Sequence, residues 1–324
     1  MAIKTGIAAQ IGGKAEGTYG TPVTVDRFWE YESENIQTDV GVVEVAQLGA
    51  GRFLRSDRRK TFIKGGGGPV NFVVLNKGFG LLLEHAIGQN TITGASADKT
   101  HTIIHDAAAL QGKSLTIQKG VPDVGGTVRA FTYEGGKVKN WELKANLDEA
   151  LKLMLDFDFQ NVLTGTALAA ASYSATTEPF IFSEGALTLN AVAQSVRNFS
   201  IRGDNALATD RRFIGNSKAE PLAGGLSPIT GQLDVEFEDL TRYAAWVAGT
   251  ILATLELEFT SATVIPTTAT PYSFKITIPK LAYTGGTPAV GGPDIVQNPT
   301  PFQALYDGTN PIVTVEIVTS DTVS

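Results

Sequence analysis

Gly68-Pro-Val-Asn-Phe-Val-Val-Leu-Asn76, followed by Phe79-Gly-Leu-Leu-Leu-Glu-His-Ala-Ile-Gly88, has the pattern of a strand that leads into a helix. The same pattern returns as Thr230-Gly-Gln-Leu-Asp-Val-Glu-Phe237 followed by Leu240-Thr-Arg-Tyr-Ala-Ala-Trp-Val-Ala-Gly249. In both copies apolar residues alternate along the strand, and the helix carries them at positions i, i+3, i+4 and i+7 before a closing glycine. Corresponding positions are 161 residues apart, so the sequence predicts one β-rich unit present twice.

The repeat divides the chain into a first unit at 1–165, a linker at 166–178 and a second unit at 179–324. The linker is rich in Thr, Ala and Ser, as flexible connections are. Abundant glycine and threonine, together with valine-rich alternating runs, point to strands joined by turns. We therefore expect two tandem, mainly β units, each with one helix and long loops.

Outside the repeated module, alternation and turn residues predict further elements. The cleanest strand is Leu151–Phe159, and Glu134-Gly-Gly136 reads as a hairpin turn between strands at 127–133 and 137–143. We expect an irregular arm at 1–27 and loops or long connections elsewhere, at 44–69, 89–112, 203–230 and 284–301. Two of them, 44–69 and 203–230, precede the strand–helix modules at the same place, which predicts interaction arms.

Composition excludes several classes of protein. The chain has no cysteine, which removes disulfides and thiolate chemistry. The amino terminus lacks the pattern of a signal peptide, and no apolar run approaches the roughly 18–20 residues that span a bilayer. Up to residue 170 there are 18 basic and 18 acidic residues, and after it 8 basic and 15 acidic, so the second half carries the whole net charge of −7. This acidic balance disfavours a nucleic-acid clamp, which needs Lys and Arg against phosphates.

No catalytic or cofactor motif is present. The run Lys64-Gly-Gly-Gly-Gly-Pro69 lacks the Lys-Ser/Thr ending of a phosphate loop and precedes a strand, so we interpret it as a flexible turn. His101 and His105 have no obvious third ligand for a metal, and no nucleophile–histidine–acid set appears. We therefore expect no enzyme, no metal and no cofactor.

Two charged sets are candidates for function. The first is the basic segment with Arg52, Arg55, Arg58 and Arg59, for which docking onto an acidic surface, a solvated loop and nucleic-acid contact all stay open. The second consists of carboxylates that alternate with apolar residues along strands at 233–238 and 255–259. Such a face is either an ordinary solvated sheet surface or a negative surface that a polyanion passes without adsorbing.

Several stretches are informative through their order and coverage: Gly17–Pro22, Phe131–Val138, Leu151–Phe159, Glu184–Asn190, Asp210–Gly215, Gly231–Gly249, Pro279–Tyr283 and Phe302–Asp307. Together they resemble the major tail tube proteins of long-tailed, non-contractile bacteriophages, and the resemblance spans nearly the whole chain.

This resemblance implies β-sandwich or half-barrel units whose inner strands join those of neighbours into a β-barrel. Three duplicated chains would form a ring of six units, although six chains per ring stays open, and stacked rings would form the hollow tail of the virion. The resemblance implies manufacture in the host bacterial cytoplasm, contacts with tape measure, tail terminator and distal tail proteins, and passage of genomic DNA without specific binding.

Site residues follow from the same resemblance. The expected lumen-facing carboxylates are Asp156, Asp158, Asp234, Glu236, Glu238, Glu256 and Glu258. The expected contacts between rings are Arg52, Arg55, Arg58, Arg59, Asp210, Arg211 and Arg212.

Two other classes remain as alternatives. An adhesin-like or carbohydrate-binding β-sandwich would show clustered exposed aromatic residues, but Trp29, Trp141 and Trp246 are scattered along the chain. The inner tube of a contractile injection system is usually built from one short domain, and the duplication argues against it.

Overall fold

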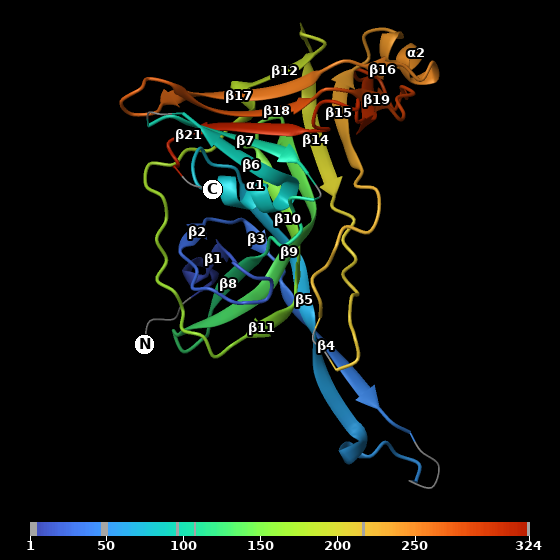
Figure 1. Ribbon diagram of the computed structural model, residues 1–324. Helices are drawn as coiled ribbons and strands as arrows, with labels where there is room; N and C mark the ends of the chain where they lie inside the picture. The colour runs from blue at the N-terminus through green and yellow to red at the C-terminus, as the bar shows by residue number, and fades with distance from the viewer. Residues whose placement is uncertain (1–4, 47–50, 95–96, 107, 216–217, 323–324) are drawn as a thin grey trace.

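The computed structural model describes residues 5–46, 51–94, 97–106, 108–215 and 218–322, and its architecture is mainly β (Figure 1). The first half contains η1 (Gly6–Ala8), β1 (Gln10–Ala15), β2 (Arg27–Trp29), β3 (Ser33–Glu34), β4 (Gln37–Glu44), η2 (Ser56–Arg58), β5 (Arg59–Val73), α1 (Gly80–Ile87), β6 (Gly88–Thr93), β7 (Lys99–His105), β8 (Leu115–Pro122), β9 (Val128–Asn146), β10 (Lys152–Phe159) and β11 (Asn161–Leu163). The second half contains η3 (Phe182–Glu184), β12 (Gly185–Leu189), β13 (Val192–Ala193), β14 (Val196–Asp204), β15 (Ile229–Glu236), α2 (Thr241–Val247), β16 (Ile251–Leu252), β17 (Leu255–Val264), β18 (Pro271–Ile278), β19 (Leu281–Tyr283), β20 (Gln297–Ala304) and β21 (Thr314–Thr319).

The larger of two antiparallel sheets runs through both halves of the chain. Its main path has the order β16-β19-β20-β15-β14-β9-β10-β5-β3, with β1, β2, β4, β8 and β11 attached beside it. The two halves meet where β9 pairs with β14, from Asn146 opposite Asn198 to Asn140 opposite Asp204. Strands separated by the expected linker therefore form one continuous sheet.

The second sheet also draws on both halves. Its seven strands have the order β13-β12-β17-β18-β21-β7-β6, and β21 of the second half pairs with β7 of the first. No strand lies within 166–178, yet neither sheet stops there. The division of the chain into two units at this linker stays a prediction. Both sheets contain strands from both halves of the chain.

A single hydrophobic core joins the two sheets and α1. The expected alternation of the strand ending at Phe159 is confirmed, because its five apolar residues are all buried: Leu151, Leu153, Leu155, Phe157 and Phe159. Phe180 follows the linker and packs against Phe259 and Phe274 of the smaller sheet, with ring centroids 6.5 and 6.0 Å away. The return of the chain after the linker is thereby fixed in the core.

The repeated module is confirmed as a strand followed by a helix in both halves. β5 leads to α1, which ends at Gly88 with φ 149°, and β15 leads to α2, which is followed by Gly249 with φ 64°. Glycine tolerates these backbone angles without strain. The two helices differ in environment, because nearly all of α1 is buried and no residue of α2 is.

The expected hairpin at Glu134–Gly136 is wrong, because β9 is one long bent strand. Its first part pairs with β8, and its second part pairs with β10. Gly135 adopts φ 65° at the bend and donates its N–H to the buried Glu16 carboxylate at 2.9 Å. Since each side of the expected turn has a different partner strand, the chain bends there without reversing.

Several segments expected to be loops or irregular are strands. Part of the amino-terminal arm is β1, and 89–112 contains the β6–β7 hairpin, whose β7 lies against β21. The end of 284–301 belongs to β20. These strands alternate weakly in sequence, so their partners stabilise them more than their own propensity does.

The largest correction concerns 44–69, because β5 already begins at Arg59. Its first part, Arg59–Gly67, pairs with the whole of β4. The glycine run expected as a flexible turn lies inside β5, and a Cβ at Gly68 would stand 2.0 Å from the Asn35 carbonyl oxygen. Residues 38–46 and 51–66, which include the paired strands β4 and β5, project from the body, and we call them the arm (Figure 1).

Candidate functional site

The described part of the chain holds no group of three His, Asp or Glu side chains placed to bind a metal ion. Within the same residues, no helix has the length and apolar composition needed to cross a membrane. His85 is buried on α1 with its Nδ1 3.0 Å from the Leu81 carbonyl oxygen, and burial lowers its pKa to about 4. His101 contacts Asn90 and the Asp321 carbonyl oxygen. These are structural roles, so the candidate sites are surfaces.

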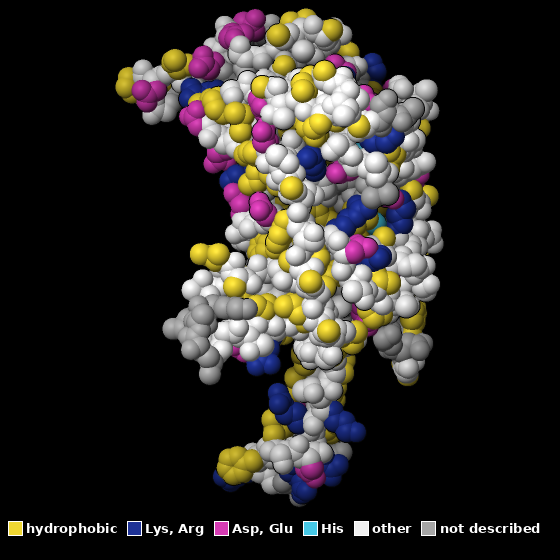
Figure 2. Space-filling model, turned by 90° about the vertical axis from the view of Figure 1, so that its left-hand side faces the viewer, with side chains coloured by type: hydrophobic (Ala, Val, Ile, Leu, Met, Phe, Trp, Pro, Cys, Tyr) yellow, Lys and Arg dark blue, Asp and Glu magenta, His cyan; other side chains and the backbone are white. Residues whose placement is uncertain are grey.

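The arm carries the first predicted set, and all four of its arginines are exposed. Arg55 pairs with Asp57 at 2.8 Å, and Arg59 pairs with Glu44 across the hairpin at 2.9 Å. Apolar side chains lie among these charges, and Phe53 is 87% exposed. Figure 2 shows the blue basic groups and the yellow apolar groups together at the far end of the arm. Exposed apolar side chains are unfavourable in an isolated monomer, so the arm is a candidate contact surface.

Asp210, Arg211 and Arg212 lie in the connection between β14 and β15, which we call the 205–228 loop. It occupies the place in the second half that the arm occupies in the first. Unlike the arm, it folds back on the first half, where Lys218 Nζ lies 2.5 Å from Asp158 Oδ1 and Glu220 pairs with Lys137. Arg211 donates to the Glu220 carbonyl oxygen. The two Asp-Arg-Arg triplets are thus in equivalent connections, but not on one surface.

Three predicted carboxylates share the outward face of the larger sheet: Asp156 of β10, with Asp234 and Glu236 of β15. The residues that alternate with them along the same strands are buried, so these carboxylates point to the other side of the sheet. Two of them are paired with cations, because Asp156 lies 3.1 Å from Lys139 Nζ and Glu236 lies 3.6 Å from Arg197. Asp234 keeps its charge and accepts a hydrogen bond from Asn198 Nδ2. The face mixes signs where a purely acidic surface was expected, since β9 and β14 bring basic side chains to it.

The other predicted carboxylates lie elsewhere. Asp158 was expected to meet water, but it is buried against Lys218, and burial raises its pKa while the lysine opposes that change. Glu238 follows the end of β15 and is exposed. Glu256 and Glu258 lie on β17 of the smaller sheet, where Glu256 pairs with Lys275 at 3.1 Å. The seven carboxylates therefore do not form one continuous face.

The sequence analysis expected strands that join those of neighbouring copies, but it did not say which strands lie at the ends of the larger sheet. Within the described residues, β3 and β4 pair only with β5, and β16 pairs only with β19. Backbone groups along such edges are available to another strand. Part of the first edge is covered, because the Ile36 N–H donates to Glu34 and its carbonyl oxygen accepts from Lys119 at 2.7 Å.

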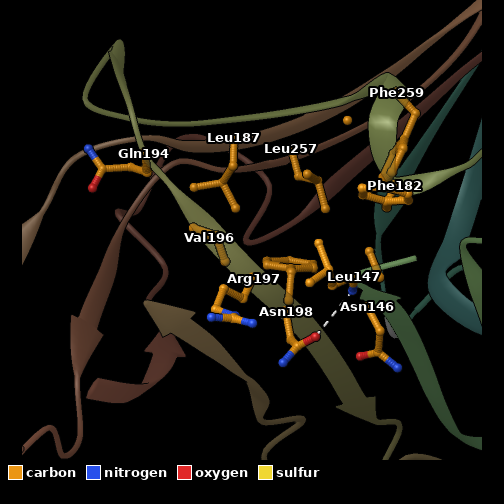
Figure 3. Close-up of a pocket in the computed structure, with 13 residues that line it drawn as sticks. Asn146, Leu147, Phe182, Leu187, Gln194, Val196, Arg197, Asn198, Leu257 and Phe259 are labelled. Carbon is orange, nitrogen blue, oxygen red and sulfur yellow. Dashed lines mark hydrogen bonds between the residues drawn. The ribbon is translucent and has the colours of Figure 1, made fainter. Parts of the chain in front are cut away.

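A cavity of about 100 Å³ between the two sheets was also missed (Figure 3). Leu187 and Leu257 point into it from the smaller sheet, toward Val196 on β14. Leu147 and Phe182 stand at its opening, 44% and 40% exposed. In the sequence, the residues that line this cavity are marked only by the alternation of apolar and polar positions. Alternation does not indicate where two strands of different sheets leave a gap between them.

Comparison with known proteins gives this architecture an identity. The family model for phage tail tube proteins matches residues 6–304. No curated protein sequence matches the chain. Because the family match covers nearly the whole chain, and because the fold is the mainly β arrangement expected of such proteins, the chain belongs to the phage tail tube proteins, the structural components of the virion tail.

Proposed function

We propose that copies of this chain join edge to edge into closed rings, which stack into the hollow tail tube that conducts DNA into the host cell. The observation that carries the proposal is the larger sheet, which runs unbroken through both halves and ends in β3–β4 on one side and β16 on the other. A sheet with two open ends is completed when its two ends meet in neighbouring copies.

The junction inside the chain supplies the geometry for the junction between chains. In the first half Glu34 lies opposite Val70 of β5, and in the second half Ile201 lies opposite Gly231 of β15. Val70 and Gly231 are 161 residues apart, so β3–β4 corresponds to β14. Since β14 pairs with the preceding half through β9, the β3–β4 end of one copy pairs with the β16–β19 end of the copy before it.

The two helices support the same arrangement. α1 is covered by the body of the chain, and Asn205 of the 205–228 loop donates to the Ala86 carbonyl oxygen at 2.9 Å. No residue of α2 is buried by the part of the chain that the structure describes, although Ala245 and Trp246 pack against the core. Val247, which corresponds to Ala86, is 65% exposed. The neighbour that extends the sheet would bring the base of its arm to this helix, as Asn205 at the base of the 205–228 loop reaches α1.

Three duplicated chains per ring would give six repeated modules. The lumen would be lined by the outward face of the larger sheet, with Asp156, Asp234 and Glu236. Glu238, Glu256 and Glu258 would lie near the ends or on the outside of the ring. Asp158 would act as the buried partner of Lys218 and not as a lumen residue. Mixed and paired charges would bind phosphates weakly and let DNA slide.

The remaining partners follow from this function. The tape measure protein would occupy the lumen before DNA does, and tail terminator and distal tail proteins would cap the two ends of the stack. Manufacture would take place in the host bacterial cytoplasm.

Negative-stain electron microscopy of the concentrated protein, with the ring mass from light scattering, tests this function. Rings of three copies that stack into tubes are the expected result, and six copies would overturn the ring size alone. Ile251→Lys places a charge on the open edge at β16, where Ile251 is 61% exposed, and should suppress rings. Val290→Lys, at a 78% exposed loop position, is the matched control and should assemble normally.

A further inference from the structure

The tip of the arm is an apolar knob between two arginines. It reads Arg52-Phe-Leu-Arg55, and Phe53 and Leu54 are 87% and 63% exposed. Residues 51–62 contain five basic side chains and a single acidic one, Asp57. Nothing in the described part of the same chain covers these two apolar side chains, although covering them would be favourable by the hydrophobic effect.

The cavity between the two sheets has the opposite character. Its inner wall is apolar, with Leu187, Leu257 and Phe259 buried behind the exposed Leu147 and Phe182. An open apolar hollow of this kind is filled better by a hydrophobic side chain than by water.

Acidic residues adjoin the opening of the cavity. Asp148 and Glu149 directly follow Leu147, and Glu184 stands between Phe182 and Gly185, which both line the cavity. Arg197, which lines the cavity, pairs with Glu236 at 3.6 Å, and Glu149 pairs with Lys152 at 3.6 Å, so the acidic groups stay in excess. The opening is therefore a negative rim around an apolar hollow, complementary to a positive knob with an apolar centre.

The two surfaces lie at opposite ends of the molecule. In Figure 1 the arm points down from the body, while β12 and β17, which carry the cavity, lie at the top. Figure 2 shows magenta acidic groups over the upper part and blue basic groups over the arm. Knob and cavity cannot meet within one chain, but they would face each other if copies stacked head to tail.

We propose that the arm tip of one copy inserts Phe53 into the cavity lined by Leu187 and Leu257 of a copy in the adjacent ring, with Arg52 and Arg55 against Asp148, Glu149 and Glu184. This inference rests on the proposed function and names the surface that receives the arm. It fixes the polarity of stacking, because the contact is heterologous and joins unlike ends.

Disulfide trapping tests the contact directly, because the chain has no cysteine of its own. The variant Phe53→Cys/Phe182→Cys is assembled under reducing conditions and then oxidised, and cross-linked species are read on a non-reducing gel. Cross-links between chains are expected in tubes and not in monomers. The control pair Phe53→Cys/Val290→Cys places the second thiol at a more exposed site outside the cavity, 78% against 40% for Phe182, and should still not cross-link.

A second pair of variants covers the case in which the cysteine variant does not assemble. Phe53→Ser should raise the protein concentration needed for tubes by about tenfold or more, since the burial of one aromatic side chain is lost. Phe53→Leu should restore assembly to near the original level. Normal tube formation by Phe53→Ser would overturn the contact while leaving the tube function intact. Tubes of Phe53→Cys/Phe182→Cys that cross-link no more than the control pair would do the same. Absence of rings and tubes from the unaltered chain would instead remove the proposed function.

Discussion

At the scale of single residues, the glycine run of β5 shows how strictly backbone approach limits sequence. Gly68 has φ 146°, and a Cβ there would stand 2.0 Å from the Asn35 carbonyl oxygen; at Gly65, φ is 123° and the Phe159 carbonyl oxygen would be 2.3 Å away. Neither backbone conformation nor space admits a side chain. The glycines let β5 pass close to its neighbours at the base of the arm.

Gly68→Ala should therefore lower the free energy of unfolding by about 2 kcal/mol or more, through strain and displaced backbone. The measurement is urea unfolding of the unassembled chain. Gly165→Ala is the control, because nothing lies within 4 Å of a Cβ at that site. Equal stability of the two variants would contradict the role given to Gly68.

His85 is a residue whose burial makes stability depend on pH. Burial lowers its pKa in the folded chain from 6.5 to about 4, so between these values the unfolded chain binds the proton and the folded chain does not. Stability from this group is complete above pH 6.5 and is lost as pH falls toward 4, by about 3 kcal/mol. His105 acts in the same direction, since burial also lowers its pKa.

His85→Gln should flatten the pH dependence of unfolding between pH 6.5 and 4 without removing the part due to His105. Unfolding midpoints measured across that range, for the variant and the unaltered chain, check this. An unchanged slope would show that His85 is protonated in the folded state.

At the scale of elements, the 205–228 loop is held to the first half by two ion pairs, Lys218–Asp158 and Lys137–Glu220. Burial opposes the charged forms, lowering the pKa of Lys137 and raising that of Asp158. Such pairs add little net stability, but removal of one partner leaves an uncompensated buried charge.

Lys218→Met should cost about 3 kcal/mol of unfolding free energy, and Lys218→Met/Asp158→Leu should recover much of it. A double-mutant cycle from urea unfolding measures the coupling. Arg55→Met breaks the exposed Arg55–Asp57 pair and should leave stability unchanged. Additive effects of the two buried substitutions would show that the loop is held by other contacts.

At the scale of the whole molecule, basic and acidic groups are concentrated in different regions of the surface. The basic arm projects at one end of the molecule, and β12 and β17 of the acidic second half lie at the other (Figure 1), while ring closure would depend on backbone pairing along the sheet edges. Exposed charge contacts weaken as salt rises, whereas strand pairing and apolar burial persist.

Raising the salt concentration from about 0.1 M to about 1 M, where the Debye length falls from ~10 to ~3 Å, should therefore shorten tubes while rings keep their mass. Sedimentation and electron microscopy across a salt series measure the two levels separately. Rings that dissociate before tubes shorten would place the ionic contacts within the ring instead.

The sequence by itself determined the local periodicities. The strand–helix order in both halves, the helix positions and the buried side of Leu151–Phe159 follow from alternation and 3.6-residue spacing, and the structure confirms them. The division of the chain into two repeated units stays a prediction. The family resemblance, also visible in the sequence, is confirmed over residues 6–304. The candidate surfaces were predicted only as charged segments, and their placement as lumen or ring contact stays a prediction.

Tertiary structure alone decided which strands are neighbours. β9 stays extended through Gly135 because β8 and β10 pair with its two parts, and Asp158 is buried because a loop sixty residues away brings Lys218 to it. The same long-range pairing leaves the sheet edges, α2 and the cavity uncovered. Periodicity reports which side of a strand is apolar, whereas burial depends on what else arrives there, and that is set by contacts between residues far apart in the chain.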